Sequence, residues 1–592
     1  MSLSSTLSTA LSGLRSTQAG IDLVSKNVAN ADSVGYTKRR LNPTQQLVGD
    51  RTNAVDPGAV QRVYDQAVQR QMFLERSGAA YATTVADYTQ SLDRLYGSPG
   101  SANSLDGAIN DFGKAIGGLA DNPGDFSNRA DVLSKAENLT ARIGSISNGI
   151  QDLRTSTERR LSDVVERANG TLSELADLNT KIAATGFGSP NAALEDERDR
   201  LITELSSYLD VSISTNSDRT VTIRTETGQT LVDRADAYQL KFEGAGRLDA
   251  KATLNNDSIA EPQRLGVLTV VAPGGAEFDL TRSKMIRSGE IAALFELRDE
   301  TLVQAQVQMD ELATGLARSF SDLPVSFTDD DDGSETTVSF NEPAADQALS
   351  VVFDLNGERQ NLTVAPDPGQ SLNYGQIAAE FNRLSELSDI EIENDGGTAI
   401  GLTGFPPEPD FEIISMSTTA LKEEGAGVGL PLFVSANPEQ VISGDSDIVG
   451  LAERLRVNTA FREDPGLLTR YADGIASGDT TRAEHMRDAL TGKPRMFSAE
   501  AAINGMAAPF QGTVSSFARA IVNHQGAVAE NAQNIAEGQK IALASIESRF
   551  AEKAGVNIDE EMANLLKLQN SYGANARVMT AAREMLDMLM RM

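Results

Sequence analysis

The chain has 592 residues, with 84 acidic and 52 basic side chains, a formal net charge of -32 and no cysteine. A surface of this charge repels phosphate backbones and anionic lipid, which argues against nucleic-acid binding and against a role at a membrane surface. The lack of cysteine excludes disulfides, thiolate nucleophiles and cysteine-based zinc sites, and the length predicts roughly three to five domains.

Residues 3–28 predict a helix whose apolar positions repeat every seven residues. One column holds Leu7, Leu14, Ile21 and Val28, and the second column begins at Leu3. A period of 3.5 residues gives the narrow seam of helices that pack lengthwise. Ser and Thr interrupt the leucines, so the segment does not have the form of a secretory signal peptide. The sequence has no run of about 18 apolar residues that would predict a membrane span.

Turn-forming residues predict that this helix ends near Asn30. Asn27, Asn30 and Gly35 belong to that cluster, and such residues favour turns over helix interiors. Residues 36–65 are expected to be irregular or extended, and a second helix is expected over about 65–96.

The strongest interior pattern predicts one long helix, or two in line, over 127–184. Apolar residues recur there at steps of three and four from Leu139 to Ile182. At 1.5 Å per residue such a helix reaches roughly 85 Å, a length typical of a rod-like subunit. The acidic cluster Glu195 to Asp199 is expected on a helix, and Arg198 and Arg200 favour ion pairs within that same helix.

The period changes to two at Asp210, which predicts strands up to about residue 289. Residues 290–320 return to a helical pattern, and a second β-rich block is expected over 323–445. Its clearest element is a hairpin at Asn356-Gly357, a preferred two-residue turn. The acidic run Asp329 to Asp332 does not fit an EF-hand register, so we expect a solvated turn there and no metal site.

The C-terminal region predicts mixed structure over 446–505, a long helix over 511–553 and a terminal helix capped by Asn557. Glu560 three residues later would complete a capping box. The terminal helix repeats the seven-residue pattern of the N-terminus. One column holds Leu565, Tyr572, Met579 and Leu586, and the second includes Leu568 and Leu589. Two matched seams at opposite ends of the chain predict that the termini meet.

The predicted fold is therefore multidomain α + β, a long helical-bundle and coiled-coil core formed by both termini, with two inserted β-rich domains. We expect a terminal assembly domain, a long-helix rod domain and two β domains. The terminal assembly domain is expected over 1–62 and 554–592, and the long-helix rod domain over 63–209, 290–322 and 446–553. The two β domains are expected over 210–289 and 323–445. The terminal helices either close a monomer as a hairpin or serve a polymer. Because each seam buries little on its own, we favour ends that become ordered in a polymer.

The two ends resemble the axial proteins of the bacterial flagellum, which form its rod, hook and hook-associated parts. Residues 27–36 read N-V-A-N-A-D-S-V-G-Y and are similar to the group's N-x-A-N-x-x-x-x-G-[YF] turn. Residues 556–578 are similar to its V-[ND]-[IL]-x-E-E-x-x-N-L-x-x-x-Q-x-x-Y-x-A-N-A-[RK]-V pattern. Within the group, residues 36–39, 191–211 and 288–300 resemble the hook-associated protein 1 family, although Lys38 stands where Arg is usual. The block 323–445 resembles no family that we can name.

The resemblance implies a structural subunit at the junction of hook and filament, assembled as a ring-like homo-oligomer. It implies the hook protein and the second junction protein as partners, and an export chaperone at the C-terminal helix. It also implies an extracellular location, reached through the flagellar type III pathway without a cleaved signal peptide. The predicted assembly interface consists of Leu3, Leu7, Leu14, Ile21, Val28, Leu565, Leu568, Tyr572, Met579, Leu586 and Leu589. The family turn motif consists of Asn27, Asn30, Gly35 and Tyr36.

The sequence offers no catalytic constellation. It contains no GxGxxG, P-loop or GxSxG motif, and its two histidines, His485 and His524, lack a catalytic or metal-binding context. We therefore expect neither an enzyme nor a cofactor. Two alternatives stay open: a hook-type axial protein, or a flagellar surface protein whose 323–445 domain binds a host or carbohydrate ligand.

Overall fold

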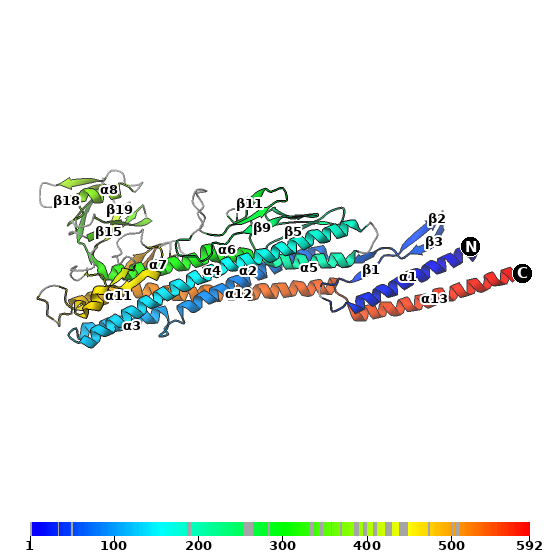
Figure 1. The fold of residues 1–592 in the computed structure, drawn as a ribbon, viewed down its shortest axis with the longest axis horizontal. Helices are drawn as coiled ribbons and strands as arrows, with labels where there is room; N and C mark the ends of the chain where they lie inside the picture. The colour runs from blue at the N-terminus through cyan, green and yellow to red at the C-terminus, as the bar shows by residue number, and fades with distance from the viewer. Residues whose placement is uncertain are drawn as a thin grey trace.

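The computed structural model shows an elongated molecule in which long helices follow the long axis and both termini lie at one end (Figure 1). The residues it describes are 3–33, 35–48, 51–185, 191–252, 265–281, 284–331, 336–341, 343, 347–356, 358–366, 370–383, 390–394, 400–406, 411–420, 429–436, 448–471, 474–476, 478–498, 501, 503 and 509–591. Within these ranges, no helix has both the length and the apolar character needed to cross a membrane.

The two terminal helices lie side by side at that end. Helix α1 spans Leu3–Ala29 and helix α13 spans Ile558–Arg591, and the two pack against each other (Figure 1). Asn557 caps α13, because its side chain accepts hydrogen bonds from the backbone N–H groups of Asp559 and Glu560 at 3.0 and 3.3 Å. The predicted terminal helices and their meeting are confirmed. We call α1 and α13 together the terminal pair.

Short strands follow α1, as expected for an extended segment. Their bounds are β1 Arg39–Leu41, β2 Thr44–Val48, β3 Arg51–Asp56 and β4 Val60–Arg62. β1 pairs antiparallel with β4, and β2 pairs antiparallel with β3. The β2–β3 hairpin touches α1, where the Ser12 hydroxyl accepts a 3.1 Å hydrogen bond from the backbone N–H of Val55.

Long helices between the termini form a rod. Their bounds are α2 Gln66–Tyr96, α3 Leu105–Asp121, α4 Phe126–Ala184, α5 Ala192–Tyr208, α6 Gly289–Glu296, α7 Leu302–Ser321 and α12 Val514–Ala554. A π-helical turn, Leu297–Thr301, joins α6 to α7. α4 is a single helix of 59 residues, so the first of the two options for 127–184 is correct. α3 was not predicted.

α2 and α12 run antiparallel along the rod, with Arg76 bound to Glu547 at 2.5 Å and Lys553 bound to Asp65 at 2.7 Å. Two apolar clusters hold the rod together: one lies among α3, α4, α7 and α12, and the other among α2, α4, α5 and the first β lobe. Smaller elements cover the first cluster. They are β20 Phe433–Ser435, α9 Leu451–Arg454, β21 Leu455–Val457, α10 Thr459–Glu463, the 3-10 turn Pro465–Leu468, α11 Thr481–Thr491, β22 Arg495–Phe497 and β23 Phe510–Gly512.

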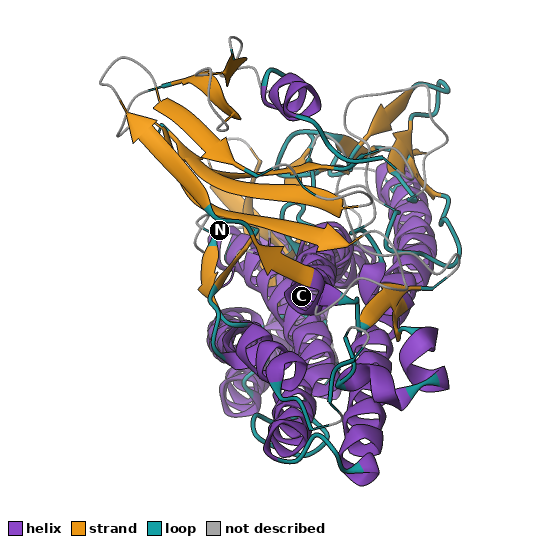
Figure 2. Cartoon of the chain, turned by 90° about the vertical axis from the view of Figure 1, so that its left-hand side faces the viewer, coloured by secondary structure: helices purple, strands orange, loops and turns teal. Residues whose placement is uncertain are grey.

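The first β lobe lies along α4 and α5. Its strands are β5 Ser212–Thr215, β6 Val221–Arg224, β7 Thr230–Asp233, β8 Asp236–Ala237, β9 Gln239–Phe242, β10 Leu268–Val271 and β11 Glu277–Asp279. They form a four-stranded sheet in the order β5-β6-β7-β8 and a three-stranded sheet in the order β11-β10-β9. Figure 2 shows that most strands of the chain, those of both β lobes together, lie on one side of the helices.

The second β lobe lies at the end of the molecule farthest from the termini (Figure 1). Its elements are β12 Asp322–Pro324, β13 Phe327–Asp331, β14 Thr336–Phe340, β15 Gln347–Leu355, β16 Glu358–Val364, α8 Tyr374–Phe381, β17 Glu391–Asn394, β18 Ile400–Phe405 and β19 Phe411–Ala420. Two four-stranded sheets, β12-β19-β15-β16 and β13-β14-β18-β17, enclose an apolar core of their own. The strand that enters the lobe, β12, is paired with the last strand, β19.

Two details of this lobe bear on the sequence predictions. The β15–β16 hairpin is confirmed, with Leu355 opposite Glu358 and a positive φ of 56° at Asn356, although Gly357 lies outside the described residues. The expected turn at 329–332 is wrong for Asp329 to Asp331, which belong to β13, while Asp332 is not among the described residues. The block 323–445 holds 23 acidic and 3 basic side chains, so it accounts for most of the net charge of the chain.

Candidate assembly interface

The predicted interface residues lie on the terminal pair with different degrees of burial. Leu14 is buried, and Tyr572 is 41% exposed. The half-buried members are Leu7, Ile21, Val28, Leu565, Leu568, Met579 and Leu586. The side chains of Leu3 and Leu589 lie outside the described part of the chain.

The two helices come close together at small residues that the apolar pattern did not single out. A Cβ atom added to Gly20 would lie 3.1 Å from Leu568 Cδ1, and one added to Gly13 would lie 2.9 Å from Asn575 Nδ2. Seven residues after Gly20, Asn27 faces Glu561. Glycines spaced by seven residues allow two helix backbones to come close, and that spacing is the signal that the apolar pattern missed.

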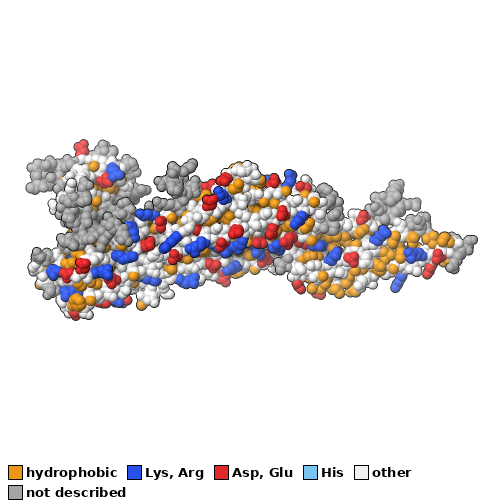
Figure 3. All heavy atoms as spheres, in the orientation of Figure 1, with side chains coloured by type: hydrophobic (Ala, Val, Ile, Leu, Met, Phe, Trp, Pro, Cys, Tyr) orange, Lys and Arg blue, Asp and Glu red, His pale blue; other side chains and the backbone are white. Residues whose placement is uncertain are grey.

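Large apolar side chains stay in contact with solvent around this contact. On α13 they include Met562, Leu566, Val578 and Met585, and Leu566 is 60% exposed. At about 100° per residue, Met562 and Leu566 lie on one flank of α13, and Val578 and Met585 lie on another. Figure 3 shows hydrophobic side chains dominating the surface of this end, whereas charged side chains cover the rod. A contiguous apolar surface of this kind marks a site of association.

The turn motif closes the end of α1. The Asn30 side chain donates a 2.8 Å hydrogen bond to the Lys26 carbonyl, which satisfies one of the last carbonyls of the helix. Gly35 has a φ of 82°, a left-handed conformation that favours glycine. The Tyr36 hydroxyl then returns to α1 and donates a 2.8 Å hydrogen bond to Asn27 Oδ1.

Asn27 is the central residue of this motif, and its side chain is only 1% exposed. Its amide nitrogen donates to the Arg39 carbonyl at 2.9 Å and to Glu561 Oε2 at 3.0 Å. Its amide oxygen accepts from Tyr36 and from the backbone N–H of Arg39 at 3.2 Å. One side chain therefore joins the end of α1, the segment that follows it and the first turn of α13.

Residues 36–39, which we call the strap, lie between α13 and α5. On the α13 side, Lys38 Nζ binds Glu560 at 2.8 Å and Glu561 at 3.3 Å. Its backbone N–H also donates to the carbonyl of Ala554 at 2.7 Å. Burial acts to lower the pKa of Lys38, but the hydrogen bonds to Glu560 and Glu561 outweigh it and raise that pKa.

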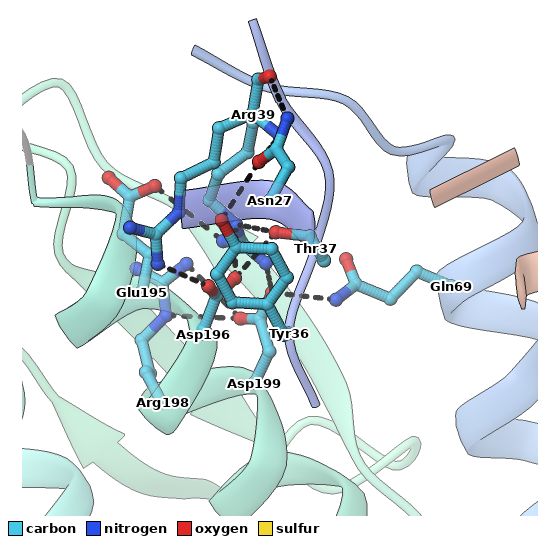
Figure 4. A network of polar contacts seen from close by, with 10 residues as sticks. Asn27, Tyr36, Thr37, Arg39, Gln69, Glu195, Asp196, Arg198 and Asp199 are labelled. Atoms are coloured by element: carbon cyan, nitrogen blue, oxygen red, sulfur yellow. Dashed lines mark hydrogen bonds and ion pairs between the residues drawn. The ribbon is translucent and has the colours of Figure 1, made fainter. Parts of the chain in front are cut away.

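On the other side, the strap binds the first turns of α5 (Figure 4). The Thr37 hydroxyl donates to Asp196 Oδ1 at 2.5 Å, and Arg39 binds Asp196 Oδ2 at 2.9 Å. Arg62 adds contacts of 2.9 Å to Asp196 and 2.5 Å to Asp199. Burial opposes the charge of Arg62, yet its carboxylate neighbours, Asp199 above all, raise the pKa of Arg62.

These contacts bear out one sequence interpretation in part and extend it. Arg200 pairs within α5 with Glu197 at 2.7 Å, and Arg198 pairs with Asp199 at 3.3 Å. Asp196 and Asp199 are also bound by Arg39 and Arg62 from the N-terminal segment, which the sequence interpretation did not include. Within the described ranges, no group of His, Asp or Glu side chains could hold a metal ion.

Known proteins resemble both the interior and the ends of the chain. A sequence model described as the flagellar hook-associated protein FlgK helical domain matches residues 89–326. A second model, described as the flagellar basal body rod FlgEFG protein C-terminal region, matches residues 547–592.

Full-length relatives are similar at low identity. The flagellar hook-associated protein 1 of Escherichia coli (strain K12) is 22% identical over 601 residues, which cover 99% of each chain. That of Salmonella typhimurium is 24% identical over 619 residues, 99% of this chain and 100% of the relative. That of Bacillus subtilis (strain 168) is 22% identical over 597 residues, 98% and 96% of the two chains. The solved structure of the flagellar hook junction protein FlgK from Burkholderia pseudomallei aligns with a TM-score of 0.46 and 15% identity, covering 81% of this chain and 99% of that one.

Proposed function

We propose that the chain is a member of the flagellar hook-associated protein 1 family, to which it is similar over 98–99% of its length, and that it joins the hook to the filament as a structural component of the bacterial flagellum. In this proposal it forms a ring-like layer of identical subunits, with the hook protein on one side and the second junction protein on the other. The domain divisions expected from the sequence are retained as part of the proposal, and no enzymatic activity is assigned.

The observation that carries the proposal is the exposed apolar surface of the terminal pair. α13 uses one face for α1 and leaves apolar residues in water on two other flanks, so it can contact two neighbours at once. A contact between different flanks of identical subunits is heterologous and produces rings or helices instead of closed dimers. Burying one such side chain contributes about 1.5–3 kcal/mol, and each subunit offers several.

The distribution of charge supports association at this end. The segments 1–62 and 554–592 together carry 11 basic and 9 acidic side chains, in a chain whose net charge is -32. Like charges on neighbouring copies therefore repel weakly where the apolar flanks meet, and the strongly acidic second lobe lies at the opposite end. We propose that the same apolar helix is held by a chaperone before export through the flagellar type III pathway.

The two matched regions separate the proposal from a hook-type axial protein. The C-terminal match, 547–592, is to a rod-protein model, so the terminal pair alone fits any axial subunit. The match over 89–326 is to the helical domain of a hook-associated protein, and that region builds most of the rod. The interior therefore favours the junction over the hook.

Localisation tests the proposal directly. We expect that cells of the source bacterium lacking this gene keep their hooks and lose their filaments. We also expect that a gold-labelled antibody against the chain marks only the boundary between hook and filament. Label along the whole hook would favour the hook-type alternative. Label along the filament, together with normal motility after deletion of 323–445 and loss of binding to a host or glycan surface, would favour the surface-binding alternative.

A further inference from the structure

The strap has an alternating pattern that relates two separate parts of the molecule. Thr37 and Arg39 bind Asp196 on α5, whereas Tyr36 binds Asn27 on α1 and Lys38 binds Glu560 and Glu561 on α13. In an extended backbone, successive side chains point to opposite faces. The side chains of Thr37 and Arg39 therefore hold the rod, and those of Tyr36 and Lys38 hold the terminal pair. Arg39 also lies over the Tyr36 ring at 4.7 Å and binds Asn27 through its backbone, which ties the two sides of the strap together.

Without the strap, the terminal pair would be connected to the rod by two turns. One runs from Asn30 to Gly35, and the other is the break at Gly555 to Asn557 between α12 and α13. Turns at the ends of elements are where hinge rotations occur. Two such turns at the same level of the molecule would let the pair swing as a unit.

Among the described residues, the apolar clusters of the rod do not hold the terminal pair in place against such a swing. The apolar clusters of the rod contain members of α2, α4, α5 and α12, but none of α1 or α13. Apolar contacts are also non-directional and tolerate sliding. Charge-assisted hydrogen bonds, in contrast, require defined distances and angles.

The strap contacts are protected from water, which strengthens them, except the contact of Lys38 with Glu560, whose side chain is 63% exposed. Exposed fractions are 1% for Asn27, 2% for Thr37, 2% for Glu561 and 8% for Asp196. In such surroundings a displaced partner would leave a charge or an amide buried without a hydrogen bond, so only one arrangement is favourable.

We infer that the strap fixes the angle between the terminal pair and the rod, and that Thr37, Lys38 and Arg39 act as positioning residues for the assembly helices. The inference rests on the proposed function only in assigning that angle a role in assembly. The experiment measures the angle itself, so its outcome is independent of where the protein lies in the flagellum.

The absence of cysteine allows spin labels to be placed without removing native thiols. Labels at Arg70→Cys on α2 and Ala574→Cys on α13 report the distance across the strap. Labels at Asp22→Cys on α1 and Ala574→Cys report the distance within the terminal pair. All three native side chains are exposed. The measurement is the distribution of electron–electron distances in the full-length chain.

The expectation from the sequence is that the ends become ordered in a polymer, but it considers only the apolar seam. Because Asn27 and Lys38 add polar contacts to α13, we now expect a narrow distribution for both label pairs in the otherwise unchanged single chain. In the double variant Thr37→Val, Arg39→Gln, the distance across the strap should broaden and shift, while the distance within the pair stays unchanged. Lys38→Met, which releases the α13 side, should have the same effect. The control Arg160→Gln removes a 2.5 Å contact with Glu290 between α4 and α6 and should change neither distance.

Three results would overturn the inference. The distance across the strap could stay narrow and unshifted in both strap variants, or both distances could broaden together in them, which would make the strap a general part of folding. A broad distance within the pair in the unchanged chain would show that the strap does not order the pair at all.

Discussion

The amide of Asn27 donates a 3.0 Å hydrogen bond to the carboxylate of Glu561, which lies 534 positions away in the sequence. Both side chains are almost fully buried, at 1% and 2% exposure. The two ends of the chain are thus joined by a polar contact at the base of the terminal pair, and the apolar seam extends from there toward the termini.

Replacement of Asn27 by alanine should loosen both terminal helices. It leaves the Glu561 carboxylate without this donor and the Tyr36 hydroxyl without its acceptor, at a cost of about 2–4 kcal/mol. Hydrogen exchange of the full chain should show lost protection in both α1 and α13. The control Asn30→Ala removes an exposed bond to the Lys26 carbonyl and should cost less than about 1 kcal/mol. Equal effects of the two changes would contradict the central role of Asn27.

Two glycines on the terminal pair should respond in opposite directions. Gly20→Leu adds a side chain where even a Cβ would lie 3.1 Å from Leu568, so overpacking should cost about 1–3 kcal/mol. Gly573→Ala has no atom within 4 Å of the new Cβ and should stabilise α13 by about 0.5–1 kcal/mol. The rate of trypsin cleavage after Lys567 and Arg577 measures both effects. Faster cleavage in Gly573→Ala would show that this glycine is needed for packing.

Leu566→Ser should separate assembly from folding. Leu566 is 60% exposed, so the free chain should lose less than about 0.5 kcal/mol of stability. In cells, however, the variant should fail to retain filaments, because the apolar contact between copies is lost. Lys567→Ser, at the next and also exposed position, is the matched control. Filament counts by electron microscopy and the melting temperature of the purified chain give the two readings. Full filament retention with Leu566→Ser would rule out this flank as a contact.

The rod should show a pH dependence that originates at Asp310. Its carboxylate accepts hydrogen bonds from the backbone N–H groups of Gly450 and Ala452, at 2.8 and 2.9 Å, and burial raises its pKa to about 6. The folded chain therefore binds this proton more tightly than the unfolded chain, whose carboxylates titrate near 4. Between about pH 4 and pH 6, this group makes the fold less stable as pH rises.

Asp310→Asn removes that titration. The stability of the variant relative to the unchanged chain should therefore increase between pH 4.5 and pH 7.5, by up to about 3 kcal/mol. Thermal unfolding at the two pH values measures the difference. A relative stability that stays constant or falls with pH would show that Asp310 is ionised throughout this range.

The helices of the fold were predictable where their pattern is local. The seven-residue repeat located α1 and α13, and the three-and-four spacing located α4. α3 was overlooked although its signals are present, since Ser104 caps it and Leu105, Ile109, Phe112 and Ile116 follow at helical spacing. A short helix between two turns is easily taken for a connection when no neighbour is known.

The polar contacts of the site could not be predicted in the same way. Arg198, a neighbour in the sequence, does bind Asp199 at 3.3 Å, but the fold also brings Arg39 and Arg62 to Asp196 and Asp199 from far along the chain. Glu560 was expected to return to its own helix start, and it binds Lys38. Ion pairs depend on which segments become neighbours, and that is decided by packing of the whole chain.

The pairing of β12 with β19 has a practical consequence. The chain enters and leaves the second lobe through two strands that lie side by side, with Asp322 opposite Thr419. Any compact domain whose own ends are adjacent, such as a fluorescent reporter or an affinity tag, can be spliced between these strands without separating them. The molecule is thus a natural display scaffold, with its cargo carried at one tip and its attachment helices at the other.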